Sequence, residues 1–122
     1  MSETKFIEHK GRRILLMDFS NTKDKAQVMR TCGEIKALVE KEPENSIYGL
    51  VDITGSPFDS EIAQALKELA KHNKPYVKVS ATVGVQGIRM VILRGIMAFS
   101  GRKNFEIIET REKALDWLAE QK

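Results

Sequence analysis

The chain has 122 residues, 42% of them apolar, which is enough to bury one core of ordinary size without a metal or a disulfide. Its one cysteine, Cys32, excludes an intramolecular disulfide, and its formal net charge of +3 is too small to indicate nucleic-acid binding. The N-terminal segment lacks the continuous apolar stretch of a secretory signal, and no window approaches the about twenty apolar residues of a membrane span. We therefore expect one domain over residues 1–122, in the cytoplasm, with no transmembrane segment.

The chain is predicted to begin with a β-hairpin, in which strands 5–9 and 12–19 flank a turn at Lys10 and Gly11. The second of these segments contains the apolar run ILLM, which is typical of a buried strand. Residues 24–42 then place their apolar side chains at helical spacing, with lysines and glutamates on the other face. An amphipathic helix is expected there.

The middle of the chain alternates between strand and helix patterns. Residues 47–53 form a compact apolar run that is too short for a typical helix. Residues 59–72 carry one apolar stripe at helical spacing, with Asp59 or Ser60 in position to cap the helix. Residues 77–83 alternate valine and alanine with polar residues, which is the period of a strand. A strand, a helix and a second strand follow one another here.

The last part of the chain continues the alternation. Residues 88–100 predict a helix, residues 104–108 a strand, and residues 111–121 a final helix capped by Thr110. The full order is therefore ββαβαβαβα. Strands that alternate with helices in this way are joined by right-handed crossovers. We expect an α/β fold with a mainly parallel five-stranded sheet, an antiparallel N-terminal hairpin and four covering helices.

The charges are unevenly distributed along the sequence. No acidic residue occurs between Asn73 and Phe105, whereas this stretch has six basic ones: Lys74, Lys78, Arg89, Arg94, Arg102 and Lys103. A basic end of the domain could attract an acidic protein surface, a phosphorylated ligand or anionic lipid. The alternative is that these side chains are solvated and merely flank the apolar segments.

Three stretches carry a recognisable pattern: VDITGSPFDSE from Val51, KHNKPYVKVSATVGVQGI from Lys71, and FSGRKNFEIIETREKALDWL from Phe99. In order and spacing they resemble the SpoIIAA-like family of small bacterial STAS domains. The resemblance extends over about residues 5–118 and contains no catalytic signature. It implies the STAS fold and a domain that binds another protein.

In sporulation-type STAS proteins a serine at the start of the second helix is phosphorylated by a partner kinase, and the resemblance places that role on Ser60. The interaction loop that the resemblance implies comprises Asp52, Thr54, Gly55, Ser56, Phe58 and Asp59. The match requires one residue to be deleted from the loop, and Glu61 and Ile62 follow where the family has small residues. The alternative is that Asp59 or Ser60 only caps the helix.

The helix predicted over residues 88–100 has two apolar sides. On a wheel of 100° per residue, its broad face is expected to lie in the core and comprises Ile88, Val91, Ile92, Gly95, Ile96 and Phe99. The opposite side carries Met90, Leu93 and Met97, flanked by Arg89 and Arg94. This second patch needs a cover, which would be another chain, as in a homodimer, a lipid-like apolar ligand, or another element of the same chain. Peripheral contact with a membrane is a separate expectation. The alternative is packing against Trp117, Leu118 or the start of the chain.

No catalytic residue, metal site or cofactor is predicted. His9 and His72 have no partner in the sequence pattern, and Cys32 falls on an apolar helix seam where an inert thiol is expected. Asp18 and Asp52, each near the end of a strand, could border a cleft. The leading hypothesis is a non-enzymatic protein-interaction and regulatory module with Ser60 as its candidate switch. The second is a binder of a lipid-like apolar ligand, and the third is an enzyme acting on a small anion.

Overall fold

The structure, a computed structural model, describes residues 4–20, 22–99, 101 and 104–121. Within these residues five strands form one sheet in the spatial order β1-β2-β3-β4-β5. The strands are β1 (Lys5–His9), β2 (Arg12–Asp18), β3 (Ile47–Asp52), β4 (Val77–Val83) and β5 (Phe105–Ile107). Strand β1 pairs with β2 in antiparallel fashion and all the other pairs are parallel. The predicted sheet is confirmed.

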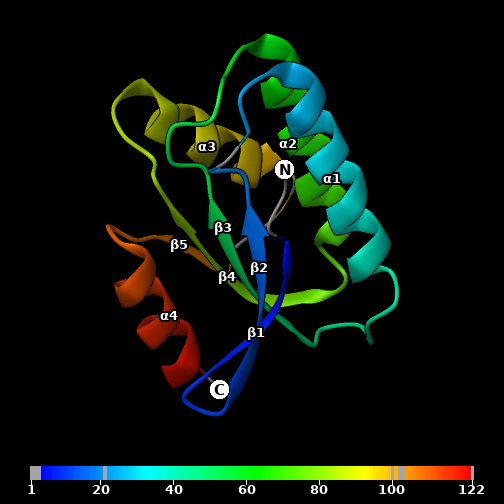
Figure 1. The fold of residues 1–122 in the computed structure, drawn as a ribbon, viewed down its shortest axis with the longest axis vertical. Coiled ribbons are helices and arrows are strands. Elements are labelled where there is room, and N and C mark those ends of the chain that lie inside the picture. The colour runs from blue at the N-terminus through cyan, green and yellow to red at the C-terminus, as the bar shows by residue number, and fades with distance from the viewer. Residues whose placement is uncertain (1–3, 21, 100, 102–103, 122) are drawn as a thin grey trace.

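Helices cover both faces of this sheet, as Figure 1 shows. They are α1 (Lys25–Val39), α2 (Ser60–Asn73), α3 (Ile88–Phe99) and α4 (Arg111–Glu120). Helices α1, α2 and α3 lie on one face, and α4 lies alone on the other. Strand β2 supplies both cores because successive side chains alternate, so that Leu15 and Met17 face α1 and α2 while Ile14 and Leu16 face α4. The predicted order ββαβαβαβα is confirmed.

The ends of the elements follow from local chemistry. Helix α2 begins at Ser60 because the Asp59 carboxylate accepts a hydrogen bond from the backbone N–H of Ile62 (2.8 Å), so Asp59 is the cap and Ser60 the first helical residue. Helix α1 ends at Val39, three residues before the predicted end, since the residue before Pro43 is biased away from the helical conformation. Among the residues described, no helix has the length and apolar character needed to cross a membrane.

The orientation predicted for α3 is wrong. Ile88 and Val91, expected in the core, are 71% and 67% exposed, whereas Met97, expected on a surface, is only 6% exposed. Met90 and Leu93 pack against the core formed by α1, α2 and the sheet, and not against Trp117 or Leu118 of α4.

The error has a physical cause, because hydropathy cannot distinguish two apolar sides of one helix. Ile96 of the predicted core face is buried as expected. Arg102 and Lys103 of the basic stretch, Ser100 at the predicted helix end, and the side chain of Phe99 lie outside the described residues.

Candidate functional site

Two buried aspartates lie side by side at the carboxyl edge of the sheet. Asp18 ends β2 and Asp52 ends β3, and the parallel register pairs them directly. Both side chains are buried. Parallel strands bring their carboxyl ends to one edge, where α/β proteins commonly form their binding sites. The sequence allowed these residues to border a cleft, and the structure places both at this edge with their side chains buried.

Each aspartate organises the turn that follows its strand. One carboxylate oxygen of Asp18 accepts hydrogen bonds from the backbone N–H and the hydroxyl of Ser20. One oxygen of Asp52 likewise accepts from the backbone N–H of Thr54 (3.0 Å) and from its hydroxyl (2.6 Å). Aspartate side chains commonly bind the backbone two residues later in this way. The same turn chemistry is thus repeated on neighbouring strands.

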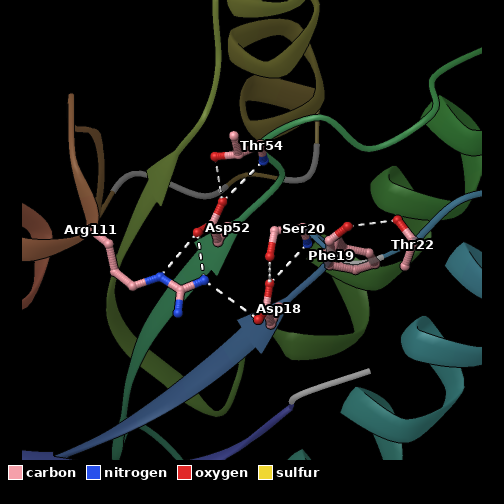
Figure 2. Close-up of polar contacts among 7 residues, drawn as sticks. All are labelled: Asp18, Phe19, Ser20, Thr22, Asp52, Thr54 and Arg111. Carbon is pink, nitrogen blue, oxygen red and sulfur yellow. Dashed lines mark hydrogen bonds and ion pairs between the residues drawn. The ribbon is translucent and has the colours of Figure 1, made fainter. Parts of the chain in front are cut away.

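Arg111, the first residue of α4, bridges the two carboxylates (Figure 2). Its Nε and Nη2 donate to the second carboxylate oxygen of Asp52 at 3.0 and 2.6 Å. Its Nη2 also lies 3.4 Å from the second carboxylate oxygen of Asp18. A buried carboxylate is tolerated only where it is paired and hydrogen-bonded. Arg111 therefore places one positive charge between two carboxylates that would otherwise repel each other inside the fold.

The pairing changes the proton affinity of the groups involved. Burial by itself raises the pKa of Asp52, but the hydrogen bonds from Thr54 and then from Arg111 outweigh it, so that the pKa lies below its ordinary value. Burial likewise lowers the pKa of Arg111, and the hydrogen bond to Asp52 more than offsets this, with a smaller contribution from Asp18. Both groups are charged at neutral pH. Because the Asp52 carboxylate is saturated with donors, this cluster acts as a structural clamp rather than as a general base.

The clamp holds the base of the β3–α2 loop, which comprises residues 53–59. Gly84, which follows β4 with φ of +84°, lies so close that a Cβ there would be 2.3 Å from Thr54 Oγ1 and 2.4 Å from the Thr54 backbone nitrogen. Further along the loop, Arg89 of α3 donates from Nη1 to the carbonyl of Ser56 (3.1 Å), and its guanidinium lies 5.3 Å from the ring centre of Phe58. These contacts fix the loop at several points.

The end of the loop and the start of α2 are exposed. Asp59, Ser60 and Glu61 are all open to solvent, as are Thr54 and Gly55 nearer the sheet. Lys25, at the start of α1, lies 2.9 Å from a carboxylate oxygen of Asp59 and 3.1 Å from one of Glu61. The hydrogen bond to Asp59, followed by that to Glu61, raises the pKa of Lys25. The N–H of Ile62 and then Lys25 lower the pKa of Asp59. Ser60 therefore lies between two acidic groups that share one lysine.

The structure brings the predicted loop residues together, and of the predicted helix patch Arg89 contacts them. Asp52 and Thr54 are at the clamp, Ser56 is buried, Phe58 is half-buried, and Asp59 and Ser60 are at the exposed end. The patch predicted on residues 88–100 is divided instead. Met90, Leu93 and Met97 face inward, Arg89 binds the loop, and Arg94 is exposed.

Sequence reasoning missed Arg111 and Ser20. A signal for Arg111 was present, because a cation at the first position of a helix is disfavoured by the helix dipole. Such a residue calls for an acidic partner, and Asp52 is that partner although it is 59 positions away. Ser20 carried no comparable signal, since serine is ordinary after a strand.

A small apolar cavity of about 70 Å³ lies between the sheet and helices α2 and α3. Its wall comprises Met17, Phe19, Val51, Ile53, Leu66, Leu69, Ala70, Asn73, Val77, Ser80, Thr82, Leu93, Ile96 and Met97. Asn73, Ser80 and Thr82 give it a polar side. In this measure one water molecule needs about 10–15 Å³, so the cavity has room for a small apolar group.

The two histidines, which the sequence analysis considered as possible catalytic or metal-binding residues, each contact one acidic side chain. His9 lies 2.7 Å from a carboxylate oxygen of Asp116, and His72 lies 2.8 Å from one of Glu40. The hydrogen bond from His9 lowers the pKa of Asp116. Within the described residues, no group of histidine, cysteine and acidic side chains is arranged to hold a metal ion.

Cys32 should be unreactive in the folded protein. The thiol is buried against the core of α1 and α2, and this burial raises the pKa of Cys32 to about 11. Roughly one thiol in a thousand is then ionised at pH 8, and the thiolate is the reactive form. We expect Ellman's reagent to label Cys32 slowly in buffer and at once in guanidinium chloride. Complete labelling of the folded protein during mixing would contradict the buried position.

Comparison with known proteins supports the fold. No protein-family model matches the chain, and no curated protein matches it in sequence. An uncharacterised protein of the DUF3478 family with a SpoIIAA-like fold, from Shewanella loihica PV-4, is 17% identical, with a TM-score of 0.73 and coverage of 96% of this chain and 93% of that one. An anti-sigma-factor antagonist (STAS) domain protein from Planctomyces limnophilus is 15% identical, with a TM-score of 0.62 and coverage of 95% and 97%. These likenesses confirm the fold that the sequence resemblance implies: the chain has the SpoIIAA-like fold of STAS domains.

Proposed function

We propose that this chain is a non-enzymatic regulatory module that recognises another protein through the exposed end of the β3–α2 loop and the first turn of α2. The observation that carries the proposal is the contrast within this segment. Its base is held by Asp52 and Gly84 and its middle by Arg89, whereas Asp59, Ser60 and Glu61 are exposed. A rigid, exposed loop loses little conformational freedom on binding, which favours recognition. The STAS fold of the anti-sigma-factor antagonist domain protein agrees with such a role.

The same proposal includes Ser60 as the switch. Its hydroxyl is at the first position of α2, beside Asp59 and Glu61, and Lys25 holds both of those carboxylates. A phosphate adds nearly two negative charges and is favoured near a helix N-terminus and near lysine, but it is repelled by neighbouring acids. Phosphorylation would therefore compete with Asp59 and Glu61 for Lys25. The contact between α1 and α2 would change at the surface that the partner recognises.

Affinity capture with substituted proteins tests this role. We expect the wild type and Ser60→Ala to capture the same partner from a cell lysate, and Ser60→Asp to capture at least fivefold less of it. Ser46→Asp is the matched control, because Ser46 is also exposed but lies before β3, at the opposite edge of the sheet. The free energies of unfolding of all these proteins should agree within about 0.5 kcal/mol, as is usual for surface substitutions. Identical capture by Ser60→Asp and the wild type would remove the switch.

A second candidate function, the binding of an apolar ligand, is favoured by the cavity beneath α3. The wall is almost wholly apolar, with a few polar groups from Asn73, Ser80 and Thr82, which is the usual make-up of small-molecule sites. Native mass spectrometry of the purified protein should then show an adduct that Leu93→Trp removes by filling the space. Met29→Trp, on the exposed surface of α1, is the control that should keep it. Detection of the bare chain alone would count against a carrier. An enzyme acting on a small anion gains no support, because Arg111 is already engaged by the two aspartates and is not free to bind an anion.

A further inference from the structure

The outer side of α3 is an exposed apolar stripe. Ile88 and Val91 are the two most exposed large apolar side chains of the described residues, at 71% and 67%, and Met29 of α1 follows at 37%. Gly95 and Ala98 are also exposed. Because a helix turns by 100° per residue, these positions fall on one narrow stripe along the helix. This stripe is opposite to the inward side, where Leu93, Ile96 and Met97 line the cavity.

The surroundings of the stripe are basic. Arg94 is exposed beside it, and Lys67 lines a groove between α2 and α3 together with Ile92 and Gly95. Lys71 and Lys74 follow Lys67 at helical spacing, and the sequence has no acidic residue from Asn73 to Phe105. Helix α2 also carries two glutamates, Glu61, which lies 3.1 Å from Lys25 of α1, and Glu68, which is exposed. The four basic residues Lys67, Lys71, Lys74 and Arg94 outnumber them, so the net charge near the stripe is positive.

From these observations we propose that the outer side of α3 docks on the surface of an anionic lipid bilayer. The stripe comprises Ile88, Val91, Gly95 and Ala98, and the basic border comprises Lys67, Lys71, Lys74 and Arg94. Short helices with an apolar side and a basic rim lie in the plane of the membrane interface. The 12 residues of α3 span about 18 Å at 1.5 Å per residue, far less than the bilayer core, so the helix lies on the membrane and does not cross it.

A second copy of the chain or a protein partner fits this surface less well. A standard protein interface buries about 800 Å² on each partner, with a cluster of fully buried anchors at its centre. Two aliphatic side chains on one convex helix provide only a part of that area. The N-terminal turn of α3 also lies at the periphery of the molecule, on the side away from α1, as Figure 1 shows. The exposed apolar side chains of this turn can enter the headgroup layer of a membrane, which, unlike a protein partner, needs no pocket of complementary shape.

Vesicle sedimentation tests the proposal directly. We expect the protein to bind vesicles of phosphatidylcholine that contain about 30% phosphatidylglycerol, and to bind pure phosphatidylcholine at least tenfold more weakly. Binding should also fall several-fold when sodium chloride is raised from about 0.1 to about 0.5 M, since salt screens surface charge. No binding to the anionic vesicles at low salt would overturn the proposal.

Substitutions then locate the contact. The double variant Ile88→Ser, Val91→Ser should bind anionic vesicles about tenfold more weakly because it removes the apolar insertion. Met29→Ser removes an exposed apolar side chain of α1 and should bind like the wild type. Arg94→Gln should lose about fivefold, the effect of one cation near an anionic surface, whereas Arg30→Gln on α1 should lose less. Equal binding by the double variant and the wild type would place the contact elsewhere.

A gain-of-function variant completes the test. A Cβ at Gly95 would meet nothing within 4 Å, so Gly95→Phe can add an aromatic ring about one turn beyond Val91 on the stripe. We expect it to strengthen binding to anionic vesicles several-fold. Analytical ultracentrifugation supplies the competing outcome, because a dimer that the double variant dissociates would assign the stripe to a second copy and overturn the proposal. Ser60 and the β3–α2 loop are unchanged in all these variants, so this result and that of the capture experiment are independent.

Discussion

Arg111→Leu should destabilise the protein by about 2–4 kcal/mol at pH 7.5, which is the usual cost of breaking a buried ion pair reduced by solvent screening, because the Arg111 side chain is 37% exposed. Leucine leaves Asp18 and Asp52 side by side, both buried and with no cation between them. The substitution loses the two hydrogen bonds to Asp52 as well as the contact with Asp18. Urea denaturation followed by circular dichroism measures the change in the free energy of unfolding.

The pH dependence of this loss identifies its cause. In the wild type the pKa of Asp52 is depressed, so its contribution to stability is fully present above the unfolded-state pKa of about 3.9 and is lost as the pH falls through the folded value. In the variant Arg111 no longer offsets the effect of burial on Asp52, so the pKa of Asp52 should rise. The deficit of the variant should therefore shrink as the pH is lowered from 7.5 toward 5. A deficit that stays constant with pH would point to lost packing instead.

Lys113→Leu is the matched control for this experiment. Lys113 belongs to the same helix, and its ammonium lies 3.3 Å from Glu109, but both groups are exposed. Exposed pairs of this kind contribute about 0–1 kcal/mol. A loss from Lys113→Leu as large as that from Arg111→Leu would show that α4 tolerates no apolar substitution at all, and the clamp would lose its special role.

Gly84→Ala is the second substitution for which we expect a large effect, about 2–5 kcal/mol of destabilisation. Its φ of +84° disfavours any side chain, at a cost of about 1–2 kcal/mol. Its Cβ would also lie 2.4 Å from the Thr54 backbone nitrogen and 2.6 Å from the Thr54 Cα. Backbone atoms cannot give way as the end of a flexible side chain can, so the overpacking adds about 1–3 kcal/mol. Guanidinium denaturation measures the total.

Gly55→Ala separates the two contributions in Gly84→Ala. Gly55 also has a positive φ, +69°, but a Cβ there would meet nothing within 4 Å. Its substitution should cost only about 1–2 kcal/mol, from the backbone alone. In Gly84→Ala the β3–α2 loop should also be displaced, which amide chemical shifts of Thr54 to Ser60 would report. Equal costs for the two glycines would mean that the close approach of the loops does not matter for stability.

The order of the helices and strands was predictable from the sequence, because in most of the chain the apolar residues follow either the helical period of 3.6 residues or the strand period of two residues. The apolar run of β2, the alternation in β4 and the single stripe of α2 each allow one interpretation. The interaction loop was also placed correctly at the carboxyl edge of the sheet, because its residues follow β3 directly. The function of that loop stays a proposal, which the Ser60 variants can test.

What the sequence determined by itself is therefore the set of elements, their order and the position of the β3–α2 loop, since these depend on residues that are near one another along the chain. The pairing of Arg111 with Asp52 and Asp18 could not be predicted from the sequence, because that contact depends on where α4 packs against the sheet. Only the tertiary structure decided which apolar side of α3 faces the core. A helix that is apolar on two sides has no hydropathic preference between them, so its orientation is set by its contacts with α2 and the sheet, and Ile88 and Val91 are left exposed to solvent.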